Sequence, residues 1–112
     1  MSQVTTHILD TSIGKPAAGV AVSIEERKDG QWGEIGQGTT DSDGRIGDLL
    51  PNDATPEPGV YRLIFNTGDY FSARDMEYFY PKVVIVFETK DTMHYHVPLL
   101  LNPFGYSTYR GS

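Results

Sequence analysis

Residues 94–112 read HYHVPLLLNPFGYSTYRGS and combine a hairpin pattern with an unusual density of reactive side chains. The stretch begins as an alternating strand, turns within residues 102–105, resumes a strand at residues 106–109 and ends in a charged tail. Pro98 has no amide donor, so it predicts an edge position or a bulge. Histidines, tyrosines and an arginine gather here more densely than a closing strand requires, which indicates that a site is built on this hairpin.

Outward from this hairpin, strand patterns separated by turn residues fill the rest of the chain. Within residues 4–10, His7 and Leu9 fall on one face of the expected strand because side chains alternate. The apolar run at 82–88 predicts a central strand covered on both faces, and one short helix is expected at 72–78. The pattern predicts an all-β antiparallel sandwich of seven to eight strands with one short helix. The expected strands are residues 4–10, 19–27, 32–40, 59–65 and 82–88, followed by the final hairpin.

Length and composition limit the possible functions. The chain has 112 residues, a net charge of −6 and no cysteine. We expect a single domain, residues 1–112, in which any site is shallow or shared between subunits. Nucleic acid is not expected as a partner, because no Lys/Arg cluster is present to contact phosphates. No stretch approaches the ~20 apolar residues of a membrane span, so we expect no membrane partner and a cytoplasmic protein, or a periplasmic one if a signal sequence was removed.

The segment from Thr39 to Arg45 has the alternating acids of a calcium loop, but the match is incomplete. Arg45 stands where such a loop needs another oxygen ligand, and no Glu stands twelve residues from Asp41. We therefore expect Asp43 and Gly44 to form an ordinary turn. This turn presents Arg45 either as a solvated loop residue or as a site residue.

Two interpretations of the histidines are possible. His94 and His96 share one face of the final strand in the His-x-His spacing that can hold a metal. A stable metal site needs a further ligand, and the remaining histidine is His7. In the second interpretation, His7 and His96 are neutral imidazoles that exchange protons near pH 7, while Arg45 or Arg110 binds an anion. We expect the second arrangement, with no metal and no cofactor.

Two segments resemble the signatures of the transthyretin family. The first begins with His7-Ile8-Leu9-Asp10 and continues through Gly14, Pro16 and Ala17. The second runs from Tyr95-His96-Val97-Pro98 to Pro103-Phe104-Gly105-Tyr106-Ser107. The likeness covers essentially the whole chain. Asn102 stands where the family pattern has Ser, at a turn position from which we expect no effect on chemistry.

The resemblance implies a transthyretin-like sandwich and, within the family, one of two functions. The closing Tyr109-Arg110-Gly111-Ser112 resembles the terminal tetrapeptide of the family's 5-hydroxyisourate hydrolases, which its hormone carriers lack. His7, Arg45 and His96 match the hydrolases' catalytic positions. The resemblance therefore implies a homotetramer, with sites at subunit interfaces, that hydrolyses 5-hydroxyisourate to 2-oxo-4-hydroxy-4-carboxy-5-ureidoimidazoline in urate degradation. The substrate-binding residues that it implies are His7, Arg45, His96, Tyr109, Arg110 and Ser112.

Two functions outside catalysis are the alternatives. A carrier of small, hormone-like ligands would use the same groove but has no need of two histidines and a cation. A structural interaction domain would leave the combination of His7, Arg45, His96 and the Arg-Gly-Ser end unexplained.

Overall fold

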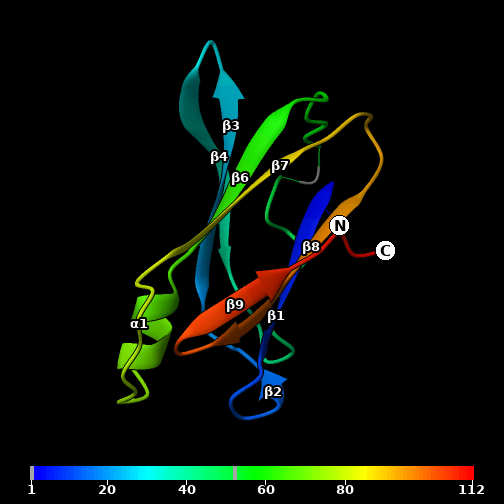
Figure 1. The fold of residues 1–112 in the computed structure, drawn as a ribbon. Helices are drawn as coiled ribbons and strands as arrows, with labels where there is room; N and C mark the ends of the chain where they lie inside the picture. The colour runs from blue at the N-terminus through cyan, green and yellow to red at the C-terminus, as the bar shows by residue number, and fades with distance from the viewer. Residues whose placement is uncertain (1, 52) are drawn as a thin grey trace.

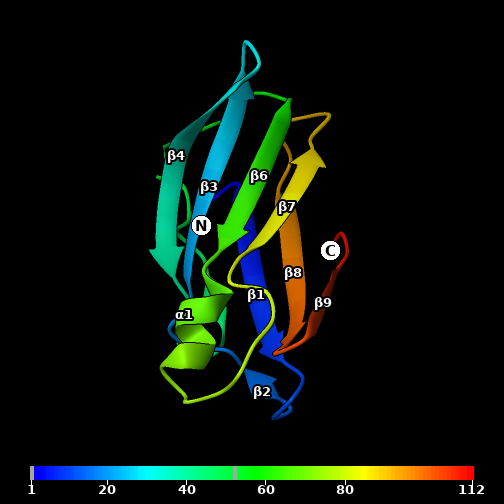
Figure 2. The same ribbon diagram turned by 60° about the vertical axis from the view of Figure 1, so that its left-hand side comes forward.

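The computed structural model describes residues 2–51 and 53–112, which form two β-sheets packed face to face (Figures 1 and 2). Met1 and Asn52 lie outside the described residues. Seven strands have four or more residues, as the predicted sandwich requires, and two further strands have two residues each. The predicted all-β sandwich with one short helix is therefore confirmed. In the two described ranges, no helix is long and apolar enough to cross a membrane.

The first sheet has β1 and β8 at its centre. Its strands are β1 (Val4–Asp10), β2 (Lys15–Pro16), β5 (Arg45–Ile46), β8 (Tyr95–Asn102) and β9 (Gly105–Thr108). β1 and β8 pair in parallel, from Val4 opposite Tyr95 to Asp10 opposite Leu101, whereas the other strand pairs of the described chain are antiparallel. The parallel pair is possible because the chain passes through the second sheet between the two strands, which no hairpin connects.

The second sheet has the strand order β4-β3-β6-β7. Its strands are β3 (Ala21–Lys28), β4 (Gln31–Thr39), β6 (Val60–Phe65) and β7 (Val83–Glu88). Asp29 and Gly30 connect β3 to β4, and both have the positive φ angles, 53° and 76°, that a tight two-residue hairpin needs. Figure 2 shows this sheet in front of the first, with β7 at its edge next to β8.

The prediction that the apolar run at 82–88 forms a central strand is wrong. β7 lies at the edge of its sheet, and Val84 and Val86 are 44% and 58% exposed. The run lacks polar alternation because its outward residues are also valines, not because both of its faces are covered. The strand therefore presents an unpaired edge and an apolar outer face.

The short helix also lies elsewhere than predicted. α1 spans Thr67–Ser72 and begins directly after β6, and it ends where the expected helix at 72–78 would begin. Burial decides its position, because Tyr70 and Phe71 pack into the core from this turn. Beyond the helix, Asp75 has a φ of 55°, which ends any helical continuation.

The two faces of the first sheet differ sharply, and this difference positions the site. Ile8 and Leu99 are fully buried against the second sheet, while His7 and His96 point to the opposite, outer face because side chains alternate along a strand. The prediction that His7 and Leu9 share one face is confirmed, and this face is the less buried one. The histidines therefore lie on the outside of the sandwich.

Pro98 lies on an interior strand, so the edge position predicted from it is wrong. β8 has β1 on one side and β9 on the other. The β9 ladder starts at Leu99 opposite Thr108, and the Thr108 hydroxyl donates to the Pro98 carbonyl at 2.8 Å. Pro98 thus lies just outside the regular β8–β9 ladder. Its lack of an amide donor therefore costs no ladder hydrogen bond with β9.

Candidate active site

The parallel register of β1 and β8 brings residues from opposite ends of the chain together on the outer face. Thr5 lies opposite His96, and His7 lies opposite Pro98. The Thr5 hydroxyl is within hydrogen-bond distance of two imidazoles, at 2.8 Å from His96 Nδ1 and 2.9 Å from His94 Nε2. Thr5 was not predicted as a site residue. Its nearness to the histidines follows only from the parallel pairing, for which a local sequence pattern gives no signal.

Arg45 reaches this face through a turn that its own sequence specifies. Asp41 Oδ1 accepts hydrogen bonds from the amides of Asp43 and Arg45 at 2.9 and 3.0 Å. Gly44 has a φ of +74°, and a Cβ there would lie 2.5 Å from the Ile8 carbonyl oxygen, so only glycine fits. The predicted Asp-Gly turn is confirmed. It delivers Arg45 to β5, directly opposite His7 in the register with β1.

A hollow of about 220 Å³ opens on this face. Three of the predicted substrate-binding residues line it, namely Arg45, His96 and Ser112. The full lining consists of Thr5, Thr6, Arg45, Ile46, Gly47, His94, His96 and Ser112. His7 does not line this hollow. It lies beside it in the sheet, opposite Arg45 on β5 and Pro98 on β8.

The closing tail is pinned to β8 at His96. The Gly111 amide donates to the His96 carbonyl at 2.9 Å, and the two residues form an antiparallel bridge. A Cβ on Gly111 would lie 2.5 Å from His96 Cδ2 and 3.1 Å from Pro98 Cγ. The tail therefore lies against the imidazole ring at a distance that only glycine permits, and this contact brings Ser112 to the rim of the hollow.

Tyr109 and Arg110 lie in a different hollow. This second hollow, of about 270 Å³, lies between β7 and the β8–β9 hairpin, and His96 lines both hollows. The Arg110 guanidinium lies 4.7 Å from the centre of the Tyr95 ring, a cation–π contact. The six predicted substrate-binding residues therefore do not surround one space in a single protomer.

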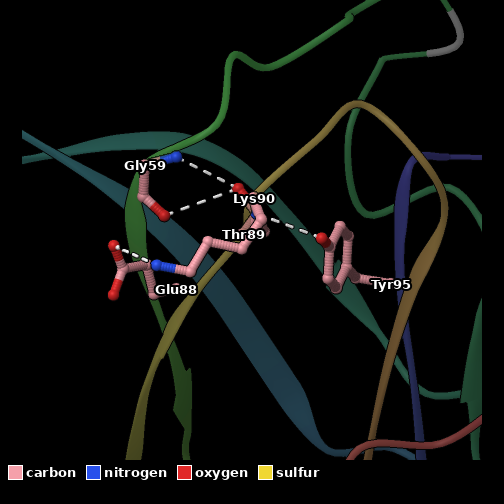
Figure 3. Close-up of polar contacts among 5 residues, drawn as sticks. All are labelled: Gly59, Glu88, Thr89, Lys90 and Tyr95. Carbon is pink, nitrogen blue, oxygen red and sulfur yellow. Dashed lines mark hydrogen bonds and ion pairs between the residues drawn. The ribbon is translucent and has the colours of Figure 1, made fainter.

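The connection from β7 to β8 is fixed before it reaches His94 (Figure 3). The Thr89 amide donates to the Gly59 carbonyl at 2.8 Å, and the Gly59 amide donates to the Thr89 hydroxyl at 3.1 Å. The Lys90 amide donates to the Tyr95 hydroxyl at 3.1 Å, and Tyr95 in turn donates to Asp91. This anchoring holds the start of β8, and with it the two imidazoles, in place.

The surroundings of His96 favour its neutral form. Burial lowers the pKa of His96 from its ordinary value of 6.5, and electrostatic repulsion from Arg45, His94 and His7 lowers it further. A hydrogen bond to the Thr5 backbone acts in the opposite direction but is the weakest of these influences. A neutral imidazole near pH 7 is able to accept a proton, as a general base must.

The His-x-His pair does not extend to a larger ligand cluster. Among the described residues, no three His, Cys, Asp or Glu side chains are grouped so that they could hold a metal ion. His94 and His96 have nearly parallel rings with centres 6.4 Å apart, and both face the Thr5 hydroxyl. The arrangement is suited to hydrogen bonding and proton exchange.

Comparison with known proteins agrees with this geometry. The model of the HIUase/Transthyretin family matches residues 4–111. A 5-hydroxyisourate hydrolase of Salmonella typhimurium is 50% identical over 109 residues, covering 96% of this chain and 79% of the relative. One of Mus musculus is 46% identical over 117 residues, covering 99% of this chain and 96% of the relative.

Solved structures of both functional branches resemble this fold. The 5-hydroxyisourate hydrolase of Klebsiella pneumoniae has a TM-score of 0.84 at 38% identity, with 97% of this chain and 98% of that chain covered. Sea bream transthyretin in complex with thyroxine has a TM-score of 0.91 at 33% identity, with coverages of 98% and 95%. Fold similarity alone therefore does not separate an enzyme from a carrier.

Proposed function

The chain belongs to the HIUase/transthyretin family, and from this premise we propose that it is an enzyme that hydrolyses 5-hydroxyisourate in the degradation of urate. Relatives from Salmonella typhimurium, Mus musculus and Mesorhizobium japonicum, with 40–50% identity over nearly the full chain, are named 5-hydroxyisourate hydrolase. The observation that carries the proposal is the hollow on the outer face, where a neutral imidazole, His96, and a guanidinium, Arg45, lie together.

His96 is the general base of the proposed reaction. His96 removes a proton from a water molecule whose oxygen attacks a ring carbonyl carbon of the substrate. The C–N bond of that cyclic amide then breaks, its electron pair goes to the nitrogen, and the nitrogen takes up a proton as the carboxylate forms. General base catalysis of this kind supplies roughly 10²–10⁴-fold in rate. The chain has no cysteine, and direct attack by water needs no covalent intermediate.

Arg45 is proposed to bind and polarise the substrate. A guanidinium presents a planar fork of N–H donors, which suits the oxygens of a planar anion and the negative charge that develops on the attacked carbonyl. The chain's net charge of −6 repels anions in general, so a local cation is needed. His7, opposite Arg45 across the β1–β5 pair, is proposed to orient the water or the substrate. Tyr109, Arg110 and Ser112 complete the proposed substrate-binding set.

Hydrolysis is tested by generating 5-hydroxyisourate in situ from urate and following its ultraviolet absorbance with and without the protein. We expect a much faster decay with the protein. His96→Asn should lower kcat by about 10²-fold or more, and Arg45→Ala should raise KM as well. Arg27→Ala, which removes an exposed arginine of β3 in the other sheet, is the matched control and should leave both constants unchanged. Decay at the uncatalysed rate in the presence of folded protein would contradict the proposal.

A carrier function is the second candidate, supported by the fold it shares with the thyroxine-bound sea bream protein. The proposed hollow argues against it, since imidazoles and a guanidinium line much of the space and an apolar ligand gains little from them. Binding of thyroxine to this chain, followed by tryptophan fluorescence, together with no effect on 5-hydroxyisourate, would favour the carrier.

We propose that four copies of the single domain formed by residues 1–112 assemble into a homotetramer with the sites at subunit interfaces. The hollow is open and shallow, β7 has an unpaired edge, and Val84, Val86, Phe104 and Tyr109 are large exposed apolar residues. Unpaired edges and apolar faces of this kind are usually covered by a partner. A molar mass of one protomer in light scattering at micromolar concentration would contradict the proposal.

The separation of Arg110 from the first hollow adds a sharper test of shared sites. Arg110 lies in the hollow beyond His96 in its own protomer, so an adjacent copy is proposed to complete the binding set. Mixing inactive His96→Asn protein with inactive Arg110→Ala protein, after dissociation and reassembly, should then restore part of the activity. No recovery in confirmed mixed oligomers would show that each site uses residues of one chain.

The absence of cysteine suits a reducing compartment, and a cytoplasmic location is the corresponding proposal. Cell fractionation that finds the protein in the periplasm would overturn it.

A further inference from the structure

A hydroxyl group joins the two imidazoles of β8. Thr5 Oγ1 lies 2.9 Å from His94 Nε2 and 2.8 Å from His96 Nδ1, and Thr5 itself is only 7% exposed. The three groups form one chain of hydrogen bonds from the exposed His94 to the partly buried His96. The hydrolytic roles assigned above do not use Thr5 or His94.

We propose that Thr5 is a positioning residue that holds His96 in the tautomer with its proton on Nδ1 and its lone pair on Nε2. The proposal rests on the function proposed above, because the tautomer matters for catalysis only if His96 is the general base. It assigns Nε2 as the atom that accepts the proton from water, and His94 as the group that keeps the Thr5 hydroxyl correctly oriented.

The two imidazoles cannot choose their tautomers independently. A hydroxyl has one proton and two lone pairs, so Thr5 can donate to at most one of the two rings, and the other ring must then donate to Thr5. If Thr5 donates to His94 Nε2, then His96 Nδ1 carries a proton and donates to Thr5. If Thr5 instead donates to His96 Nδ1, the His96 proton lies on Nε2, which can no longer accept one. His96 Nε2 is therefore a base only when Nδ1 carries the proton and donates to Thr5.

The position of Thr5 decides which nitrogen of His96 is free. Thr5 Oγ1 lies 2.8 Å from Nδ1, so Nε2 is the ring nitrogen left to meet a water molecule. A general base accepts a proton through a lone pair. The proposed role of His96 therefore requires the lone pair on Nε2 and the proton on Nδ1.

The neighbouring charges make the tautomer of His96 more important than its net protonation. Arg45 on β5, His7 on β1 and His94 on β8 all disfavour a positive charge on His96, while Glu88 and Arg110 line the second hollow. Burial has the largest effect and acts in the same direction. At neutral pH the ring is therefore uncharged, and which nitrogen holds its single proton decides whether it can act as a base.

Removal of the Thr5 hydroxyl tests the kinetic consequence. Thr5→Val keeps the branched shape and removes both hydrogen bonds, and it should lower kcat about 10- to 100-fold, the loss typical of groups that orient a functional imidazole. KM should stay within about twofold. Thr5→Ser restores a hydroxyl and should recover activity to within about threefold of the unmodified protein. The matched control is Thr11→Val, which removes the hydroxyl that donates to the Leu101 carbonyl beyond the far end of β1 and should change neither constant.

A spectroscopic measurement tests the tautomer without substrate. Long-range ¹H–¹⁵N correlation spectra of the ¹⁵N-histidine-labelled protein at pH 7.5 should show His96 with a protonated Nδ1 and an unprotonated Nε2. Thr5→Val should move the signals toward the mixture found in free imidazole, and Thr5→Ser should return them. This measurement on the unmodified protein decides the point even if Thr5→Val does not fold.

The outcomes separate the two proposals. Finding the His96 proton on Nε2, or full kcat in folded Thr5→Val, would overturn the role of Thr5 while leaving the hydrolase intact. Finding the proton on Nδ1 in a protein that leaves 5-hydroxyisourate unchanged would support the hydrogen-bonded chain and overturn the proposed function.

Discussion

Gly111→Ala is the substitution for which the structure predicts the clearest loss of activity. A Cβ at this position would lie 2.5 Å from His96 Cδ2, 3.1 Å from Pro98 Cγ and 3.3 Å from His96 Cγ. Non-bonded carbon atoms prefer separations of about 3.5–4.0 Å, so the tail or the imidazole must move by about 1 Å. A displacement of that size at a catalytic group costs about 10²-fold in rate, which corresponds to about 2.7 kcal/mol of transition-state stabilisation.

Stability should change far less than activity in this variant. At most the hydrogen bond from the Gly111 amide to the His96 carbonyl is lost, worth about 0.5–1.5 kcal/mol, which shifts the melting temperature by a few degrees. The assay is kcat/KM for 5-hydroxyisourate beside a thermal melt. Gly33→Ala is the matched control, because a Cβ there meets open space. Gly111→Ala protein with kcat/KM within twofold of the unmodified protein would refute the idea that the tail lies against the working imidazole.

Four further predictions follow from the same contacts. Arg45→Ala removes a positive charge that lowers the pKa of His96, and the pKa of His96 should therefore rise. Because only the neutral ring is a base, the acid limb of the kcat/KM profile should move to higher pH. An unchanged acid limb would exclude His96 as the titrating group. Tyr70→Phe removes the donor to Oδ2 of the fully buried Asp10, a bond of 2.8 Å, and should cost about 1–3 kcal/mol in denaturant unfolding with kcat/KM unchanged. Dialysis against EDTA should leave activity intact, whereas a loss reversed by stoichiometric zinc would revive the metal-site interpretation. Deletion of residues 110–112 should abolish most turnover and shift the melting temperature by only a few degrees; a truncated protein that keeps its activity but loses its oligomeric state would make the tail structural.

Local patterns predicted what depends on local geometry. The alternation that puts His7 and Leu9 on one face of β1 follows from the two-residue period of any strand. The turn before Arg45 follows from an Asp that caps its own amides and a glycine at positive φ. Neither feature requires knowledge of the partner strand, which is why a sequence of seven or eight residues suffices to specify each.

Features that depend on distant partners were not predictable. The hydrogen bond between Thr5 and His96 joins residues 91 positions apart, and the sequence of either strand is compatible with parallel or antiparallel pairing. The apolar run of β7 was assigned to the interior because an exposed valine face and a doubly buried strand give the same pattern. The helix moved to Thr67–Ser72 because the burial of Phe71, a tertiary effect, outweighs weak local propensity.

The tail shows why a small sandwich can combine groups from two surfaces in one site. Arg110 lies in the hollow beside Tyr95, whereas Ser112 lies in the hollow beside Arg45. Gly111 is the point where the tail passes the His96 ring, and a side chain there would have to displace the ring. His96 consequently borders both hollows, so a substrate held in the first can be influenced from the second through the position of a single imidazole. Changes at Arg110 should therefore affect catalysis even where Arg110 makes no contact with the substrate in its own protomer.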